Sequence, residues 1–220
     1  MKLQVQIVSD VVCPWCYIGK VNWDQGSKEF LQTIPGVEME VEMKPFRLDP
    51  TLPMEGKPRD EVLAAKFGGS DKMDTIFART ISAAETSGIH MEFKKGIQQP
   101  NTLHSHRLIR LAKDYNLQAE MAVSLFSAYF TDNKDLTKVD ILTSIAISIG
   151  LDATVLQNFW DTNQYLDETV EEEDRMRSLG VTGVPFFIIN DKYAFSGAQP
   201  PEVMKNILMQ ISEKENGAAQ

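Results

Sequence analysis

The sequence contains very little cysteine: only Cys13 and Cys16 in a chain of 220 residues. A small secreted scaffold carries more cysteines, spread along the chain, so a framework of structural disulfides is excluded. A chain of this length can bury a core without disulfides or structural metals. The two cysteines are therefore a reactive pair, half of a metal site, or a pair of inert buried thiols.

The sequence also lacks long apolar runs and an excess of positive charge. No stretch approaches the roughly 20 apolar residues of a membrane span, and no long apolar segment of the signal-peptide type follows Met1. Lysine and arginine total 22 against 31 acidic residues, and the net charge of −9 repels phosphate backbones. We therefore expect no membrane insertion, no nucleic-acid partner and a cytoplasmic location.

Apolar patterning predicts a β-α-β opening and an α-β-β-α ending. Residues 3–8 and 37–44 alternate apolar and polar side chains, as strands with one solvent-facing side do, and flank a helix expected over 14–33. Two short strands are expected at 186–189 and 193–195, followed by a last amphipathic helix. The polar residues after that helix, Glu213 to Gln220, are expected to fray.

Helical periodicity dominates the middle of the chain. Two helices are expected between Arg59 and Gly88, and a loop over 90–100. A further helix is expected to start at Thr137, with Asp140 three residues on, and to stop at Gly150. A polar helix over 167–179 contains the acidic run Glu171–Asp174, which we interpret as a solvated face. Three apolar stripes complete the pattern: Leu108, Leu111, Ala112 and Tyr115; Ala122, Leu125, Phe126 and Tyr129; Ile141, Leu142, Ile145, Ala146 and Ile149.

This order of elements predicts an α/β protein, namely a thioredoxin-like fold with a large inserted α-helical subdomain. The predicted thioredoxin-like parts are residues 1–48 and 166–220, and the predicted helical insertion is 49–165.

The spacing of the two cysteines favours redox chemistry. They follow a strand at the start of a helix, where free backbone N–H groups and the helix dipole stabilise a thiolate. In such a place a thiol pKa can fall from about 8.5 to roughly 3.5–7.5. We predict that Cys13 attacks a disulfide and that Cys16, one turn later, resolves the mixed disulfide. Zinc would need four ligands, and the spacing of His104 and His106 is not usual for zinc.

Other residues near the two cysteines could tune the dithiol or bind substrate. Pro185, after Val184, opens a strand, where proline often follows a cis bond. Asp10 could accept the proton of Cys16, or could be a helix-start acid or a solvated loop residue. Trp15 could form part of an apolar peptide-binding surface, or could pack locally. Asn101 is most simply the N-cap of the helix that follows it.

Taken together, several segments resemble the FrnE branch of the DsbA-family thiol–disulfide oxidoreductases. They lie in the order of that family and span nearly the whole chain: Ser9–Gly19 with Cys13-Pro14-Trp15-Cys16, Pro45–Pro50, Asn101-Thr102, His106–Leu108, Ala128–Phe130, Gly180–Pro185 and Ser196–Gln199. The resemblance implies a thioredoxin fold with a helical insertion and protein-disulfide oxidoreductase activity. It also implies that Pro185 is the cis-proline of the family.

The same resemblance gives roles to His106 and Gln199, which composition and spacing do not. His106 would lie near the active cleft, although a solvated helix face is the alternative, and Gln199 would belong to the loop before the last helix. The dipeptide Pro14-Trp15 departs from the Pro-His of periplasmic members, and this argues against a strong oxidant. The family is also similar to 2-hydroxychromene-2-carboxylate isomerases and kappa-class glutathione transferases, which commonly carry serine where Cys13 stands.

The sequence therefore predicts a dithiol–disulfide oxidoreductase that acts on protein or small-molecule disulfides as a monomer or homodimer. No bound metal or organic cofactor is expected, and glutathione is a candidate redox partner. A glutathione-dependent isomerase or transferase is one alternative. A non-enzymatic peptide-binding or holdase module on the same fold is another.

Overall fold

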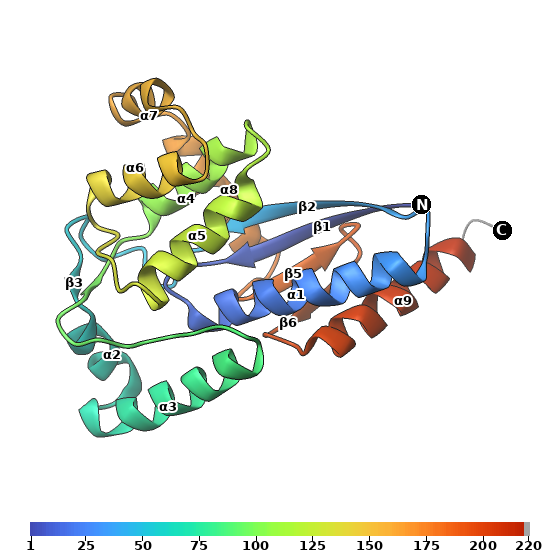
Figure 1. Cartoon of the computed structure of the whole chain (residues 1–220), viewed down its shortest axis with the longest axis horizontal. Helices are drawn as coiled ribbons and strands as arrows, with labels where there is room; N and C mark the ends of the chain where they lie inside the picture. The colour runs from blue at the N-terminus through green and yellow to red at the C-terminus, as the bar shows by residue number, and fades with distance from the viewer. Residues whose placement is uncertain (218–220) are drawn as a thin grey trace.

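A computed structural model describes residues 1–217 (Figure 1). Within them the chain forms a four-stranded sheet, a two-stranded ribbon and nine helices. In chain order the elements are β1 (Lys2–Ser9), α1 (Pro14–Thr33), β2 (Glu38–Pro45), β3 (Lys57–Pro58), α2 (Arg59–Phe67), α3 (Ser70–Thr86), β4 (Gln98–Gln99), α4 (Leu103–Lys113), α5 (Gln118–Phe130), α6 (Val139–Ser148), α7 (Ala153–Trp160), α8 (Leu166–Ser178), β5 (Phe186–Ile189), β6 (Tyr193–Ser196) and α9 (Pro201–Gly217).

The main sheet joins the two ends of the chain in the order β2-β1-β5-β6. Strand β1 is parallel to β2 and antiparallel to β5, so that Val5 lies between Val41 and Ile189. Asn190 and Asp191 turn the chain from β5 to β6, both with positive φ, as a tight hairpin turn requires. This arrangement confirms the predicted α/β, thioredoxin-like fold with helices inserted between its two parts. The exact division at residues 49 and 165 stays a prediction.

Successive side chains of β1 point to opposite faces of the sheet, and helices cover both faces. Leu3, Val5 and Ile7 are buried in the large core, to which α1 and α9 contribute on their face of the sheet. On the other face Val8 packs in a smaller cluster with Met176 of α8. Figure 1 shows α1 and α9 lying side by side along the sheet, with the remaining helices gathered toward the end where β1 points.

The inserted helices confirm most of the predicted apolar stripes, and the exceptions have local causes. All four residues of the α5 stripe are buried, whereas Tyr115 is 44% exposed because α4 ends at Lys113. Helix α6 begins at Val139 instead of Thr137, since the Thr137 hydroxyl donates to Asp135 and caps nothing. The predicted loop over 90–100 contains the short strand β4.

Three further corrections concern exposure and length. The apolar side of β2 is only partly covered, with Val41 37% exposed, because β2 is an edge of the sheet. Helix α7 is not anticipated by the sequence patterns; Asp152 caps it by accepting from Thr154 N at 2.7 Å. The expectation that residues 213–217 fray is wrong, because helix α9 continues through Gly217. The Glu215 carboxylate accepts hydrogen bonds from Lys192 and Tyr193 at the turn between β5 and β6. Residues 218–220 of the predicted frayed segment lie outside the described residues.

The acidic run in α8 is not wholly solvated as predicted. Glu173 is only 2% exposed, and its carboxylate accepts from Arg47 Nε at 2.6 Å and from Arg177 Nη2 at 2.7 Å. It also accepts from the backbone N–H of Arg47 at 3.1 Å. Burial alone would raise the pKa of Glu173, but these hydrogen bonds outweigh burial and lower it. Through its hydrogen bonds with Arg47, Glu173 therefore links the segment after β2 to α8.

Replacing Glu173 by glutamine is expected to destabilise the fold by about 2–4 kcal/mol at pH 7, because two arginines lose a buried counter-charge. A lowered pKa means that the carboxylate stabilises the fold above its unfolded-state pKa and that this contribution is lost as pH falls through the folded-state pKa. The difference between wild type and Glu173→Gln should therefore shrink as pH falls below about 4.5. Urea unfolding across pH measures this, with exposed Glu171→Gln as the matched control. Equal stability of the two variants at pH 7 would contradict the assignment.

Candidate active site

The two cysteines lie where β1 leads into α1. Cys13 is the N-cap of α1, with extended backbone (φ −97°, ψ 109°), and Pro14 occupies the first turn. The backbone N–H of Cys13 donates to Asp10 O at 3.0 Å, and that of Cys16 donates to Cys13 O at 2.9 Å. These bonds place both side chains at the first turn of the helix, as the sequence predicts. Cys13 is 5% exposed and Cys16 1%.

The two thiols differ in their surroundings. Burial raises the pKa of Cys16 well above its ordinary value, the hydrogen bond with Cys13 raises it further, and the negative charge of Asp10 adds to this effect. Cys16 is therefore a neutral thiol at neutral pH. Cys13, in contrast, lines a large cavity. Any reaction of Cys16 as a thiolate requires a group nearby that accepts its proton.

The segment before β5 lies across from the start of α1. The Val184–Pro185 bond is cis, in agreement with the sequence-based expectation. The Cys13 thiol donates to Val184 O at 3.6 Å. In the second turn of α1, a Cβ on Gly19 would lie 3.0 Å from Pro185 Cγ, so the absence of a side chain at Gly19 lets the proline approach the helix.

Asp10 and His106 form a buried polar pair behind the cysteines. Asp10 is 1% exposed; one carboxylate oxygen accepts from Leu48 N at 2.7 Å and the other lies 3.3 Å from His106 Nε2. His106 is 4% exposed, so it does not lie on a solvated helix face. Asp10 is likewise not solvated, and it is not an acid of the first turn of α1, which begins at Pro14. The inserted helix α4 thus places a histidine against the loop that carries the dithiol.

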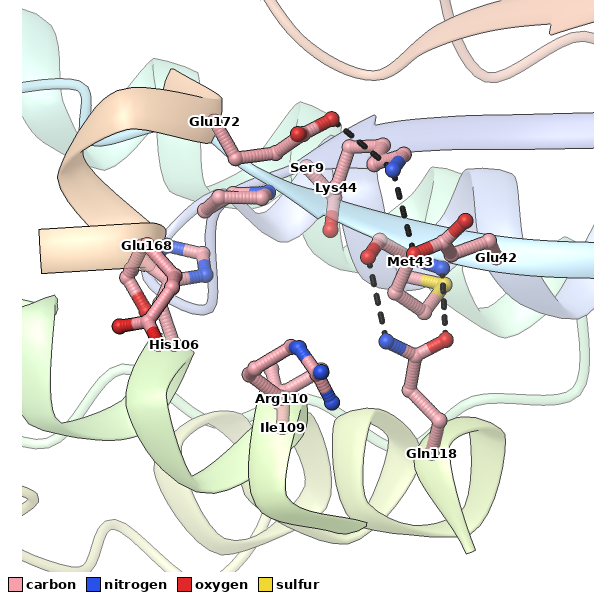
Figure 2. A pocket seen from close by; sticks show the side chains of 12 residues that line it. Ser9, Glu42, Met43, Lys44, His106, Ile109, Arg110, Gln118, Glu168 and Glu172 are labelled. Atoms are coloured by element: carbon pink, nitrogen blue, oxygen red, sulfur yellow. Dashed lines mark hydrogen bonds and ion pairs between the residues drawn. The ribbon is translucent and has the colours of Figure 1, made fainter. Parts of the chain in front are cut away.

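A small polar pocket of about 110 Å³ lies beyond His106 (Figure 2). The Lys44 Nζ lies 3.1 Å from Glu42 Oε1 and 2.8 Å from Glu172 Oε1. Gln118 exchanges two hydrogen bonds with the backbone of Met43 (Figure 2). His106 therefore connects buried Asp10 with a polar space large enough for water.

In front of the dithiol lies a larger cavity of about 970 Å³. Cys13, Pro14 and Trp15 line it from the start of α1, and Trp15 is 42% exposed. Helices α2, α3 and α5, the segment between β2 and β3 and the segment before β4 supply the other walls. These walls are mostly apolar and aromatic, and they include Leu52, Val62, Leu63, Phe67, Ile76, Phe77, Phe93, Tyr129 and Phe130. A cavity of this size can bury a small organic molecule or an extended side chain of a peptide.

Some residues singled out in the sequence lie elsewhere. The side chain of Gln199 donates to Ser196 O at 3.0 Å, and its backbone carbonyl accepts from Asn22, so it ties the last loop to α1 and does not line the cavity. Asn101 is not the N-cap, which is Thr102, but its side chain still accepts from Leu103 N at 3.1 Å. Within residues 1–217 no three histidine, cysteine or acidic side chains gather as a metal site.

The sequence does not indicate the burial of two charged residues, one in the cavity wall and one on α8. Arg59 and Glu173 are both buried charges whose sequence neighbours are mostly polar, so their burial leaves no local pattern. Gly19 and Tyr129 belong to segments that carry the family resemblance, and only the structure shows what each contacts.

Comparison with known proteins agrees with this architecture. The family model described as "DSBA-like thioredoxin domain" matches residues 4–209. The chain belongs to this DsbA-like family. A probable DsbA oxidoreductase from Streptomyces coelicolor is 30% identical with a TM-score of 0.84, over 94% of this chain and 89% of that one.

Two further known proteins resemble this DsbA-like protein, one in sequence and one in fold. The uncharacterized protein YwbO of Bacillus subtilis is 27% identical, over 98% of this chain and 100% of its own. The cytosolic disulfide reductase DsbM of Pseudomonas aeruginosa, in a structure with GSH, has a TM-score of 0.68 at 13% identity, over 96% of this chain and 99% of that one. The likeness to DsbM shows the fold alone. Within residues 1–217 no helix is long and apolar enough to cross a membrane.

Proposed function

We propose that this DsbA-like protein is a dithiol–disulfide oxidoreductase in which Cys13 and Cys16 exchange electrons with protein or small-molecule disulfides. The observation that carries the proposal is the asymmetric pair at the start of α1: one thiol faces a cavity and the other is buried behind it. A nucleophile must meet its substrate, whereas a resolving thiol needs only to reach the first sulfur.

In the first step the Cys13 thiolate attacks one sulfur of a substrate disulfide. A bond forms between Cys13 Sγ and that sulfur, the substrate S–S bond breaks, and one substrate thiolate leaves. Cys13 stands at the N-terminus of α1, the positive end of the helix dipole. The cis segment at Val184–Pro185, with its carbonyl 3.6 Å from the Cys13 sulfur, borders the position of the mixed disulfide.

In the second step Cys16 attacks Cys13 Sγ, which forms the Cys13–Cys16 disulfide and releases the second substrate thiolate. Because burial keeps Cys16 protonated, its proton must first move to a base. Asp10 is the carboxylate whose charge acts on Cys16, and His106 hydrogen-bonds it from the side of the polar pocket. We assign Asp10 as the proton acceptor and His106 as the residue that positions it.

The dipeptide between the cysteines favours work as a reductase or isomerase. Pro14 carries no charge, and the apolar ring of Trp15 lies at the cavity wall. Neither residue supplies a cation to stabilise the Cys13 thiolate, and stabilisation of that thiolate is what makes a strong oxidant. The likeness to a protein described as a cytosolic disulfide reductase supports a cytosolic site of action. We propose no resident metal or organic cofactor, and a monomer or homodimer as the working form.

Reduction of insulin by dithiothreitol tests this proposal. The reduced protein is expected to accelerate insulin precipitation, and the variant with both Cys13→Ser and Cys16→Ser is expected to leave it at the uncatalysed rate. Acceleration by the double variant would refute the dithiol mechanism. If wild type does not accelerate insulin precipitation, and wild type and the double variant suppress aggregation of an unfolded protein equally well, a holdase role on this fold would replace the proposal.

The second candidate is a glutathione-dependent isomerase or transferase, which the structural likeness to a protein solved with GSH supports. It predicts tight glutathione binding and an activity that survives Cys16→Ala, because a transferase needs no resolving thiol. A calorimetric titration with glutathione separates the two functions. The absence of binding, together with loss of insulin reduction in Cys16→Ala, would eliminate the transferase.

A further inference from the structure

Arg59 places a positive charge inside the cavity that Cys13 lines. It is the first residue of α2 and only 1% exposed. Its Nη2 donates to Lys94 O at 2.6 Å. Its Nε and Nη1 have no hydrogen-bond partner among the described residues. Buried guanidinium donors are rarely left unpaired, since each unmade hydrogen bond costs desolvation without compensation.

The surroundings of Arg59 supply no counter-charge. The rings of Phe93 and Tyr129 each lie 5.5 Å from its guanidinium carbon, which gives the cation aromatic faces and no anion. Burial raises the pKa of Tyr129 far beyond neutrality, although Arg59 opposes this shift, so Tyr129 is a neutral phenol. Its hydroxyl donates to Gln99 Oε1 at 2.8 Å. In the described part of the chain no carboxylate forms an ion pair with Arg59.

The cavity wall restricts what anion could complete this arrangement. Most of the cavity lining is apolar, with Leu52, Leu63, Ile76 and Phe77 among its members. Arg59 is the buried charge in this lining, whereas its other charged residues are half-buried or exposed: Asp49, Lys57, Glu61 and Lys66. A carboxylate on an apolar body matches both the buried guanidinium of Arg59 and the apolar wall.

We infer that Arg59 binds a carboxylate in the Cys13 cavity and selects small-molecule disulfides that carry a carboxylate on an apolar body. This substrate class rests on the proposed dithiol function. Cys13 attacks the bound disulfide and Cys16 then releases the second half, so that two electrons pass from the dithiol and two substrate thiols are formed. Arg59 takes no part in bond making and acts by holding the acid group.

Two aromatic disulfides of the same shape test the inference. The probes are 5,5′-dithiobis(2-nitrobenzoate) and its neutral bis-carboxamide, and the released aryl thiolate is followed by absorbance with the dithiol-reduced protein. Wild type is expected to prefer the carboxylate probe. In Arg59→Met this preference should fall about ten- to hundredfold, the factor for loss of a hydrogen bond to a charged group. The control is Arg79→Met, which removes the same charge from an exposed position on α3.

The outcomes separate the two proposals. If wild type releases no thiolate from either probe faster than the double cysteine variant, the proposed function fails. If both probes react but Arg59→Met keeps the preference, or Arg79→Met loses as much, the carboxylate site is wrong and the dithiol chemistry stands.

A measurement on wild type alone protects the test against misfolding of the variant. In the reaction with the carboxylate probe, 2-naphthoate should compete at least about tenfold better than neutral 2-naphthamide. Equal competition would overturn the inference. Arg59→Met is also expected to unfold at a urea midpoint no lower than wild type, because it removes an unpaired buried charge. A clearly lower midpoint would show that Arg59 serves the fold instead.

Discussion

Replacing Cys13 by serine is expected to lower the rate of disulfide reduction at least about a thousandfold, because a serine hydroxyl at the same helix start is a far weaker nucleophile than a thiolate. Replacing Cys16 by alanine should have a different result. The first step still occurs, but the mixed disulfide between Cys13 and the substrate cannot be resolved from within the protein, so it accumulates.

Mass spectrometry of each variant after incubation with excess disulfide distinguishes these results. Cys16→Ala should carry one substrate half per chain, and Cys13→Ser should carry none, because its remaining thiol is buried and neutral. Rapid modification of Cys16 in Cys13→Ser would reverse the roles assigned to the two thiols.

Replacing Asp10 by asparagine is expected to slow resolution of the mixed disulfide about a hundredfold at pH 7, at the low end of what a general base contributes. The buried Cys16 thiol would then lose its proton only to solvent. The negative charge of Asp10 raises the pKa of Cys16, so its removal lowers that pKa and resolution should recover as pH rises. Stopped-flow measurement of the second thiolate released, from pH 6 to 9, follows this change.

The matched control is Glu38→Gln, which removes one negative charge from an exposed position on β2. It should resolve the mixed disulfide at the wild-type rate. His106→Gln tests the positioning role, since it keeps a hydrogen-bond partner for Asp10 and should slow resolution less than Asp10→Asn. An Asp10→Asn variant with the wild-type rate and pH profile would remove Asp10 from the mechanism.

The overall fold could be predicted from the sequence because its signals are local. Alternation in β1 and the helix bounds of α1 and α8 depend on spacing within one segment, and the observed bounds differ from prediction by at most one residue for α1 and α8. Helix α7 escaped prediction because it is eight residues long, too short for a clear repeat. The burial of one apolar side of β2 was overestimated because an edge position cannot be read from alternation.

Spacing alone predicts only those parts of the candidate site that are adjacent in sequence, whereas the family resemblance is what indicates Pro185 and His106. Cys13, Cys16 and Asp10 lie within one short segment, whereas the partner of Asp10, His106, lies 96 positions away. Arg59 and Glu173 resemble ordinary surface charges until the chain folds around them. Their burial depends on residues from other elements, such as Phe93 and Arg47. No periodicity carries such information.

Redox titration of the purified protein in dithiothreitol buffers, with the two cysteines counted by alkylation at each potential, measures whether Cys13 and Cys16 form a reversible disulfide. We expect one transition in which both thiols disappear together, with a tenfold change in the ratio of disulfide to dithiol for about every 30 mV. This transition should be absent in Cys16→Ala. Two cysteines that stay alkylatable under oxidising conditions, or that are lost one at a time, would contradict the dithiol mechanism.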